Sequence, residues 1–475
     1  MPTSRARLES TLIFAILALL VWLPLPLGSN RPWAGAIFGL LTAILAAGCG
    51  WLQLRQWRRD SSAQRISKLP QTGIPKSSPP KHNPAFASAL PMLGLLLAVQ
   101  TWVLLQWLTG ISTDSGRSLY YLMLGLAYSL LFWLIISLFY TRQRLTLLAS
   151  VVVISATVQG FYGTLMTLSG VEWLLFTPKD SYLGVATGTF VNRNHLAGYL
   201  VMALGVGIGL LLALRDGAPW RWTALLEMLL GPKARLRLGL VIMVIALVMT
   251  RSRMGNTAFF ASLLVLGMLF ILLNKEHRVR NGLLLASLIV IDVLVISQFF
   301  GLDKLKDRLV NTRVENVVVD EQIIAYKNEQ RLDVFDYAWL QFTERPLTGF
   351  GAGSFESSFQ GYPGPEVTLH YDHAHNDYLQ FAVEYGLVGL VPLASFVLLA
   401  LYHALKALWR TDSWYRSGMG FGAAMGILGI LIHSATDFNL QIPANAATFV
   451  TLCAMAVLAG NHRKMRRSDA TGRHR

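Results

Sequence analysis

The stretch Tyr371-Asp-His-Ala-His-Asn-Asp-Tyr-Leu-Gln-Phe-Ala-Val-Glu-Tyr-Gly-Leu-Val-Gly-Leu390 joins a polar segment rich in His and Asp directly to an apolar helix. Imidazole is the side chain best suited to exchange a proton near neutral pH. Ionisable residues within membrane-spanning segments are rare and usually have a function, and His375 lies where a polar segment meets such a span. We therefore expect chemistry at this junction, with His375 at its centre.

The rest of the chain is strongly apolar. Of its 475 residues, 53% are hydrophobic and only 14% are charged. Runs of about twenty apolar residues predict membrane-spanning helices, whereas the strands of a β-barrel alternate between apolar and polar residues. The sequence thus predicts an all-α polytopic integral membrane protein. We expect about twelve transmembrane helices, near 11–28, 33–54, 87–107, 118–140, 145–168, 195–214, 238–250, 257–274, 281–300, 379–402, 418–434 and 444–460.

The chain has a net charge of +15, and its basic residues are distributed unevenly among the loops. Most Lys and Arg fall in the segments that lie on the same side of the membrane as the N-terminus. The positive-inside rule then places both termini in the cytoplasm. The basic charge reflects topology and contact with membrane lipids, so no nucleic acid is expected as a partner.

The spans divide the chain into three parts. Residues 1–300 carry predicted transmembrane helices 1–9 and a cytoplasmic linker at 55–86 that is rich in Pro, Ser, Lys and Arg. Residues 301–378 form one large periplasmic loop domain. Residues 379–475 carry transmembrane helices 10–12 and a basic cytoplasmic tail.

The large loop has two halves. Residues 303–330 are expected to be helical or loosely ordered, with a Val-rich piece at 317–319. An amphipathic helix should follow and end at Arg345-Pro346. Gly349-Phe-Gly-Ala-Gly353 lacks the preceding strand of a nucleotide-binding loop, so we interpret it as a turn. The apolar positions of the helix are Val334, Phe335, Ala338, Trp339 and Phe342.

Three arginines stand on the predicted outer side, where basic residues are disfavoured. They are Arg193, Arg251 and Arg253. The apolar run between Arg237 and Arg251 spans about 20 Å as a helix, which is shorter than the hydrocarbon core of about 30 Å. Either Arg237 snorkels from the inside or Arg251 lies at membrane depth. A single interfacial arginine is equally well explained as a lipid-headgroup anchor, but three beside a long acidic loop favour a function.

His375-Asn376, nine residues and then Gly386-Leu-Val-Gly389 resemble the signature of the O-antigen ligase and Wzy-type O-antigen polymerase superfamily. The block from Trp339 to Phe355 is similar to the segment that precedes this motif, and the resemblance extends over roughly residues 180–400. It implies a C-type glycosyltransferase of the bacterial inner membrane. Such an enzyme transfers a glycan from undecaprenyl diphosphate to an acceptor glycan or glycolipid at the periplasmic face, in lipopolysaccharide and other surface polysaccharide biosynthesis.

The resemblance also implies residue roles. Arg193, Arg251 and Arg253 would bind the diphosphate, since guanidinium groups bind phosphate oxygens in bidentate fashion. His375 would activate the acceptor hydroxyl as general base, with inversion at the anomeric carbon and with no metal or cofactor. The expected supporting residues are Asn376, Asp377, Glu384 and Asp437.

Several alternatives stay open at this point. His370 and His373 could bind a metal, although His-x-His alone is a weak signal. His195, two residues after Arg193, is expected to serve in capping or packing. A Wzy-type polymerase would use the same donor, and a protein-targeting oligosaccharyltransferase is a third variant. A transporter of anionic solutes is more remote, because such proteins usually show internal repeats.

Overall fold

The computed structural model shows a bundle of long helices. The residues that it describes are 4–67, 83–214, 232–274, 278, 282, 316–319, 322–325, 331–364, 367 and 369–461.

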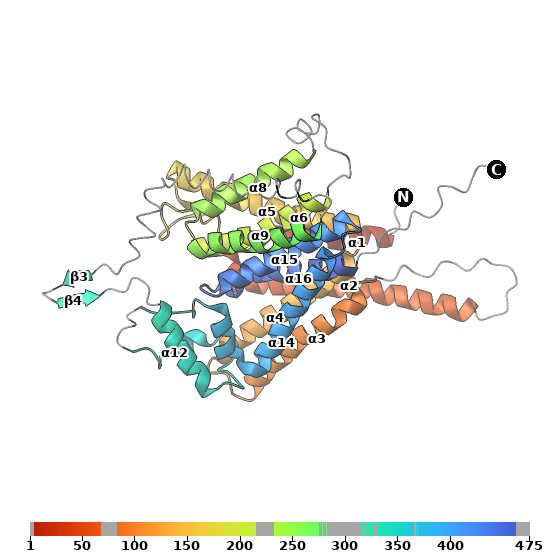
Figure 1. Ribbon diagram of the computed structural model, residues 1–475. Helices are drawn as coiled ribbons and strands as arrows, with labels where there is room; N and C mark the ends of the chain where they lie inside the picture. Colours follow the sequence, from red (N-terminus) through yellow and green to blue (C-terminus); the bar gives the residue numbers. More distant parts are fainter. Residues whose placement is uncertain are drawn as a thin grey trace.

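The long helices confirm the predicted all-α polytopic fold (Figure 1). Within the described residues, nine helices are long and apolar enough to cross a membrane. They are α2 (Pro32–Ser67), α3 (Phe86–Leu108), α4 (Ser115–Leu138), α5 (Arg142–Ser169), α6 (Arg193–Ala213), α9 (Arg253–Leu273), α14 (Asp377–Leu408), α15 (Trp414–Ser434) and α16 (Pro443–Asn461).

Three predicted spans are not among these nine. Helices α1 (Ser4–Trp22) and α8 (Pro232–Met249) lie at two of them. Helix α8 begins five residues before Arg237, so this arginine lies within the helix. The span predicted at 281–300 lies outside the described residues, apart from Gly282.

The segment before α14 differs in part from the prediction. The Val-rich piece belongs to a strand, β3 (Asn316–Val319), which pairs antiparallel with β4 (Gln322–Ala325), so the expectation of a helical or loosely ordered segment is wrong here. Branched valines favour a strand over a helix. A second small hairpin joins β1 (Trp173–Leu174) to β2 (Thr177–Pro178).

The predicted amphipathic helix is present as α12 (Arg331–Glu344), which is followed by the short helix α13 (Phe355–Phe359). Val334 and Ala338 are fully buried and form the inner face of α12. Trp339 is 59% exposed, so its expected place on that face is wrong. Figure 1 shows α12 at one end of the bundle, opposite the end from which α2 extends.

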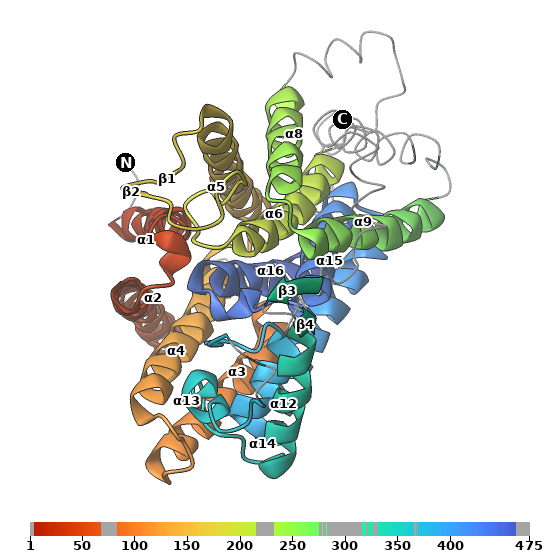
Figure 2. The same ribbon diagram turned by 90° about the vertical axis from the view of Figure 1, so that its left-hand side faces the viewer.

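Helices α6 and α15 pack backbone to backbone at the centre of the bundle (Figure 2). A Cβ added to Gly209 would lie 2.4 Å from Cα of Gly422, and one added to Gly205 would lie 2.6 Å from N of Gly426. Small residues allow such close approach between membrane helices. We call this contact the glycine seam.

Helix α14 is broken at Gly386, whose φ of 58° and ψ of −178° are not helical. The loop that follows α12 fills the break. Leu387 N donates to Pro346 O at 2.8 Å, and Val388 N donates to Leu347 O at 3.2 Å. Backbone that leaves the helix at membrane depth is tolerated only where protein groups satisfy it, and this loop provides them.

The carbonyl groups released by the same break also have donors. Phe350 N donates to Val383 O, and Gly351 N donates to Glu384 O, both at 2.9 Å. From α3, Gln106 Nε2 donates to Glu384 O at 2.9 Å, and Trp102 Nε1 donates to Tyr385 O at 2.7 Å. The break therefore fixes the first segment of α14, from Asp377 to Tyr385, against both the loop and α3.

Candidate functional site

The first turn of α14 is tied to the segment between α15 and α16. The Asn376 side chain caps the helix by accepting from Leu379 N. The Asp377 carboxylate accepts from Ser434 Oγ at 2.7 Å and from Leu440 N at 3.1 Å. Asp377 N donates in turn to Asp437 O at 3.2 Å. These bonds hold His375, just before the cap, beside Asp437 and its neighbours.

Three imidazoles surround the ring of Phe438, which comes from the segment between α15 and α16. The His373 ring stacks on it with centroids 4.2 Å apart, while His195 and His375 meet it edge-on at 4.6 and 4.8 Å. We call these three residues the imidazole cluster. His375 has a φ of 51°, an uncommon conformation for a residue with a side chain, and such strain tends to occur at functional sites.

A buried carboxylate accompanies the cluster. Asp437 is 1% exposed, and its Oδ1 lies 3.6 Å from Nε2 of His195. Asn194 Nδ2 donates to its Oδ2, and Phe438 N donates to its Oδ1 at 2.9 Å. Burial disfavours the charged carboxylate, but the interaction with His195 and the nearby His433 and His375 outweigh it and lower the pKa of Asp437 well below its usual value. The site therefore contains an anion that can stabilise a protonated imidazole.

A second carboxylate reaches the cluster through an amide. Gln380 Nε2 lies 3.0 Å from His373 Nδ1 and donates to Glu384 Oε1 at 3.0 Å. Glu384 is fully buried, and it also accepts from Gly353 N at 2.9 Å and from Phe355 N at 3.4 Å. Neighbouring backbone and amide groups therefore satisfy the Glu384 carboxylate.

The environment of His373 disfavours its charged form. Burial is the largest cause and lowers the pKa of His373, while Asp372 and the hydrogen bond with Gln380 act in the opposite direction. A neutral His373 can stack on Phe438 and accept a hydrogen bond from Gln380 Nε2 without requiring a counter-ion.

The three predicted arginines lie at the starts of two helices in contact. Arg193 is the first residue of α6 and lies 5.8 Å from the Tyr182 ring. Arg253 is the first residue of α9, and Arg251, with a φ of 51°, precedes the Ser252 cap; both are exposed.

Other contacts bring these two helix starts together. A Cβ added to Gly255 of α9 would lie 2.6 Å from Cβ of Ala197 in α6, so the first turns touch. Ala186 N donates to Met249 O at 2.9 Å, which ties the segment before α6 to the end of α8. Helix N-termini attract anions, and added guanidinium groups strengthen that attraction.

Sequence reasoning missed part of the site. The sequence predicts capping or packing for His195. In the structure this residue also faces Asp437, and it links the start of α6, where Arg193 lies, to the cluster. Phe438 and Gln380 carried no recognisable signal. For His195, the available signal was its position in the polar run from Asn192 to His195 at a helix start.

The histidines considered as metal ligands have separate partners. His370 Nε2 lies 3.1 Å from Glu356 Oε1, whereas His373 contacts Gln380 and Phe438. Over the part of the chain that the structure describes, no group of three or more His, Cys, Asp and Glu is arranged to hold a metal ion.

The comparison with protein families matches residues 238–394 to the family model described as O-antigen ligase. Over these residues the match bears out the resemblance to the O-antigen ligase and Wzy-type superfamily that the His375 and Gly386 motif indicated. It includes Arg251, Arg253, His375 and Glu384, and it leaves Arg193 outside. A comparison with curated proteins gave no match.

Proposed function

We propose, from the premise that residues 238–394 carry an O-antigen ligase domain, that this membrane protein transfers a glycan from undecaprenyl diphosphate to an acceptor sugar. The acceptor is part of a glycolipid, and the product is a lipopolysaccharide or a similar surface glycan. The reaction takes place at the periplasmic face of the bacterial inner membrane, with both termini in the cytoplasm.

The arginines supply the electrostatic part of the reaction. In this proposal Arg193, Arg251 and Arg253 bind the donor diphosphate at the adjacent starts of α6 and α9. Guanidinium groups stay charged, and they stabilise the negative charge that grows on the leaving diphosphate. Because three cations are available for this role, we propose a reaction that needs no divalent metal.

The imidazole cluster supplies the proton chemistry. His375 accepts the proton of the acceptor hydroxyl as its oxygen forms a bond with the anomeric carbon of the donor sugar. The bond between that carbon and the diphosphate oxygen breaks, and undecaprenyl diphosphate leaves with the electron pair. Attack from the face opposite the diphosphate inverts the anomeric centre.

The observation that carries this proposal is the position of His375 in a cluster with the buried Asp437. The negative charge of Asp437 favours the imidazolium that forms when a base in the cluster takes a proton. His195 connects the same carboxylate to the helix that begins with Arg193. The proposed base and the proposed diphosphate site thus share one supporting carboxylate.

The test uses cells that lack the gene. Lipid-linked and surface glycans are extracted and resolved by length, with complementation by wild type, His375→Ala or Arg251→Ala. His370→Ala is the matched control, because this histidine lies in the same segment but pairs with Glu356 outside the cluster. We expect the control to restore surface glycan and the other two variants to leave long polymer on the lipid carrier.

Each other outcome has a defined meaning. Single repeat units without long chains would indicate a polymerase. Normal surface glycan with His375→Ala would refute the proposal. A transporter would show loss of carrier movement across the membrane, which His375→Ala should leave intact.

A further inference from the structure

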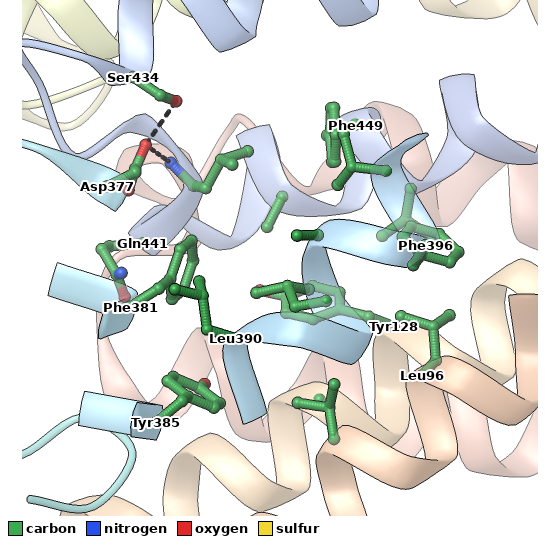
Figure 3. A pocket seen from close by; sticks show the side chains of 18 of the residues that line it. Leu96, Tyr128, Asp377, Phe381, Tyr385, Leu390, Phe396, Ser434, Gln441 and Phe449 are labelled. Atoms are coloured by element: carbon green, nitrogen blue, oxygen red, sulfur yellow. Dashed lines mark hydrogen bonds between the residues drawn. The ribbon is translucent and has the colours of Figure 1, made fainter. Parts of the chain in front are cut away.

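A cavity of about 340 Å³ lies between α3, α4, α14, α15 and α16. One end is apolar and is lined by Leu96, Phe396 and Phe449. The other end is polar and is formed by Asp377, Ser434 and Gln441 (Figure 3). The lining follows α14 from Asp377 to Leu398, so the cavity extends along the helix.

The polar end contains buried polar groups that lack hydrogen-bond partners among the described residues. Asp377 is 1% exposed and Gln441 is 6% exposed. Asp377 Oδ1 and both amide atoms of Gln441 have no hydrogen-bond partner among the residues that the structure describes. Buried polar atoms of this kind are rare in proteins, because leaving them without a partner is costly. Together they offer two acceptors and one donor, which suits a hydroxyl or amide group.

The lining does not suit a diphosphate, because its described residues offer no cation to bind one. None of the described residues that line the cavity is Arg, Lys or His, and Asp377 stands at its polar end. The arginines proposed to bind the donor lie instead at the starts of α6 and α9. Asp377 N donates to Asp437 O, so the polar end nevertheless lies directly beside the imidazole cluster.

The dimensions and the mouth of the cavity suit a lipid chain. Its volume is near the lower end of the range of about 300–1,000 Å³ for ligand pockets, which fits one chain better than several. Among the lining residues Tyr378 is 47% exposed and Leu398 is 65% exposed, so the cavity reaches the outer surface of the bundle.

We propose that this cavity binds one acyl chain of the acceptor glycolipid, with a hydroxyl or amide of that lipid on Asp377 and Gln441. The inference rests on the proposed function and extends it. Donor and acceptor then bind at different helices, the donor by its diphosphate at the starts of α6 and α9 and the acceptor by an uncharged polar group beside α14. An acceptor carried on a second diphosphate does not fit this arrangement.

The test is photo-crosslinking of the purified full chain in lipid nanodiscs without donor. One probe is an N-acylglucosamine with a diazirine in its acyl chain, and the other is a polyprenyl diphosphate with a diazirine in its isoprenoid chain. Mass spectrometry locates the adducts. We expect the N-acylglucosamine to label peptides of α3 and α16 that contain Leu96 and Phe449. Labelling of those peptides by the polyprenyl diphosphate, or no labelling by the N-acylglucosamine, would overturn the proposal.

Substitutions inside and outside the lining test whether the probe binds in this cavity. Ala394→Trp places a large side chain at an exposed lining position, and we expect labelling by the N-acylglucosamine to fall at least about tenfold. Val391→Trp, at an exposed position of α14 outside the lining, should label like wild type. Gln441→Leu removes one polar partner and should also reduce labelling. Undiminished labelling of Ala394→Trp contradicts the proposal.

The labelling experiment separates the two proposals. Normal labelling with no glycan transfer in cells would contradict the proposed function and leave the cavity assignment intact. Normal transfer without labelling would contradict the cavity assignment alone.

Discussion

The break in α14 allows a quantitative prediction for Gly386→Ala. Gly386 has φ 58° and ψ −178°, a region that is essentially restricted to glycine and costs other residues about 1–3 kcal/mol. A Cβ at this position would lie 2.3 Å from Leu347 O, so the loop must also move. That movement breaks the bonds from Leu387 N and Val388 N, each contributing about 0.5–1.5 kcal/mol. Alanine also lowers the conformational entropy of the unfolded chain, which stabilises the fold by about 0.4–1 kcal/mol, so the net loss is about 1–6 kcal/mol.

The assay is thermal and denaturant unfolding of the purified protein in detergent, followed by glycan transfer in cells. The matched control is Gly94→Ala in α3, where an added Cβ meets no atom within 4 Å and alanine should gain up to about 1 kcal/mol. We expect Gly386→Ala to unfold well before the control and to lose transfer, because the break positions the segment that starts at Asp377. Equal stability of the two variants would refute the reasoning about the break.

Three further predictions concern the site and its supports. Asp437→Asn removes the negative charge beside His195 and should reduce the transfer rate about tenfold or more with little loss of folding, and an unchanged rate would exclude an electrostatic role for this carboxylate. Burial lowers the pKa of His373, so the unfolded chain binds more protons than the folded one, and stability should fall as the pH drops below 6.5. His373→Gln should flatten this pH dependence of the unfolding midpoint, and the same slope in wild type and variant would contradict the prediction. Gln106→Leu removes the donor to Thr348 O and Glu384 O and should lower the free energy of unfolding by about 1–3 kcal/mol, whereas wild-type stability would show that other groups satisfy these carbonyls.

Much of the helical framework could be predicted from the sequence, because apolar runs of sufficient length determine membrane helices locally. The motif that begins at His375 also identified the superfamily. Contacts between distant residues could not be predicted in this way. His195 and Phe438 are far apart in the chain, and helical spacing around Arg193 gives no information about a ring contributed by another segment.

The same limit explains the errors outside the site. The exposure of Trp339 depends on which elements cover α12, and the periodicity of that helix cannot show this. The break at Gly386 is visible in the sequence only as a glycine in an apolar run. Its conformation depends on the loop from Pro346 to Gly351, which precedes α14 in the sequence and forms hydrogen bonds with the break.

The glycine seam has a mechanical consequence. Where the backbones of α6 and α15 touch at these glycines, no side chain lies between the two helices to change rotamer and let one slide or turn. We therefore expect α6 and α15 to move as one rigid unit. This unit includes Arg193 at the start of α6 and the end of α15, which leads to Asp437. The loop from Pro346 to Gly351 is instead joined to α14 by hydrogen bonds, and these can be exchanged for others. If the site opens to admit a second large substrate, we expect the opening at this loop and not at the glycine seam.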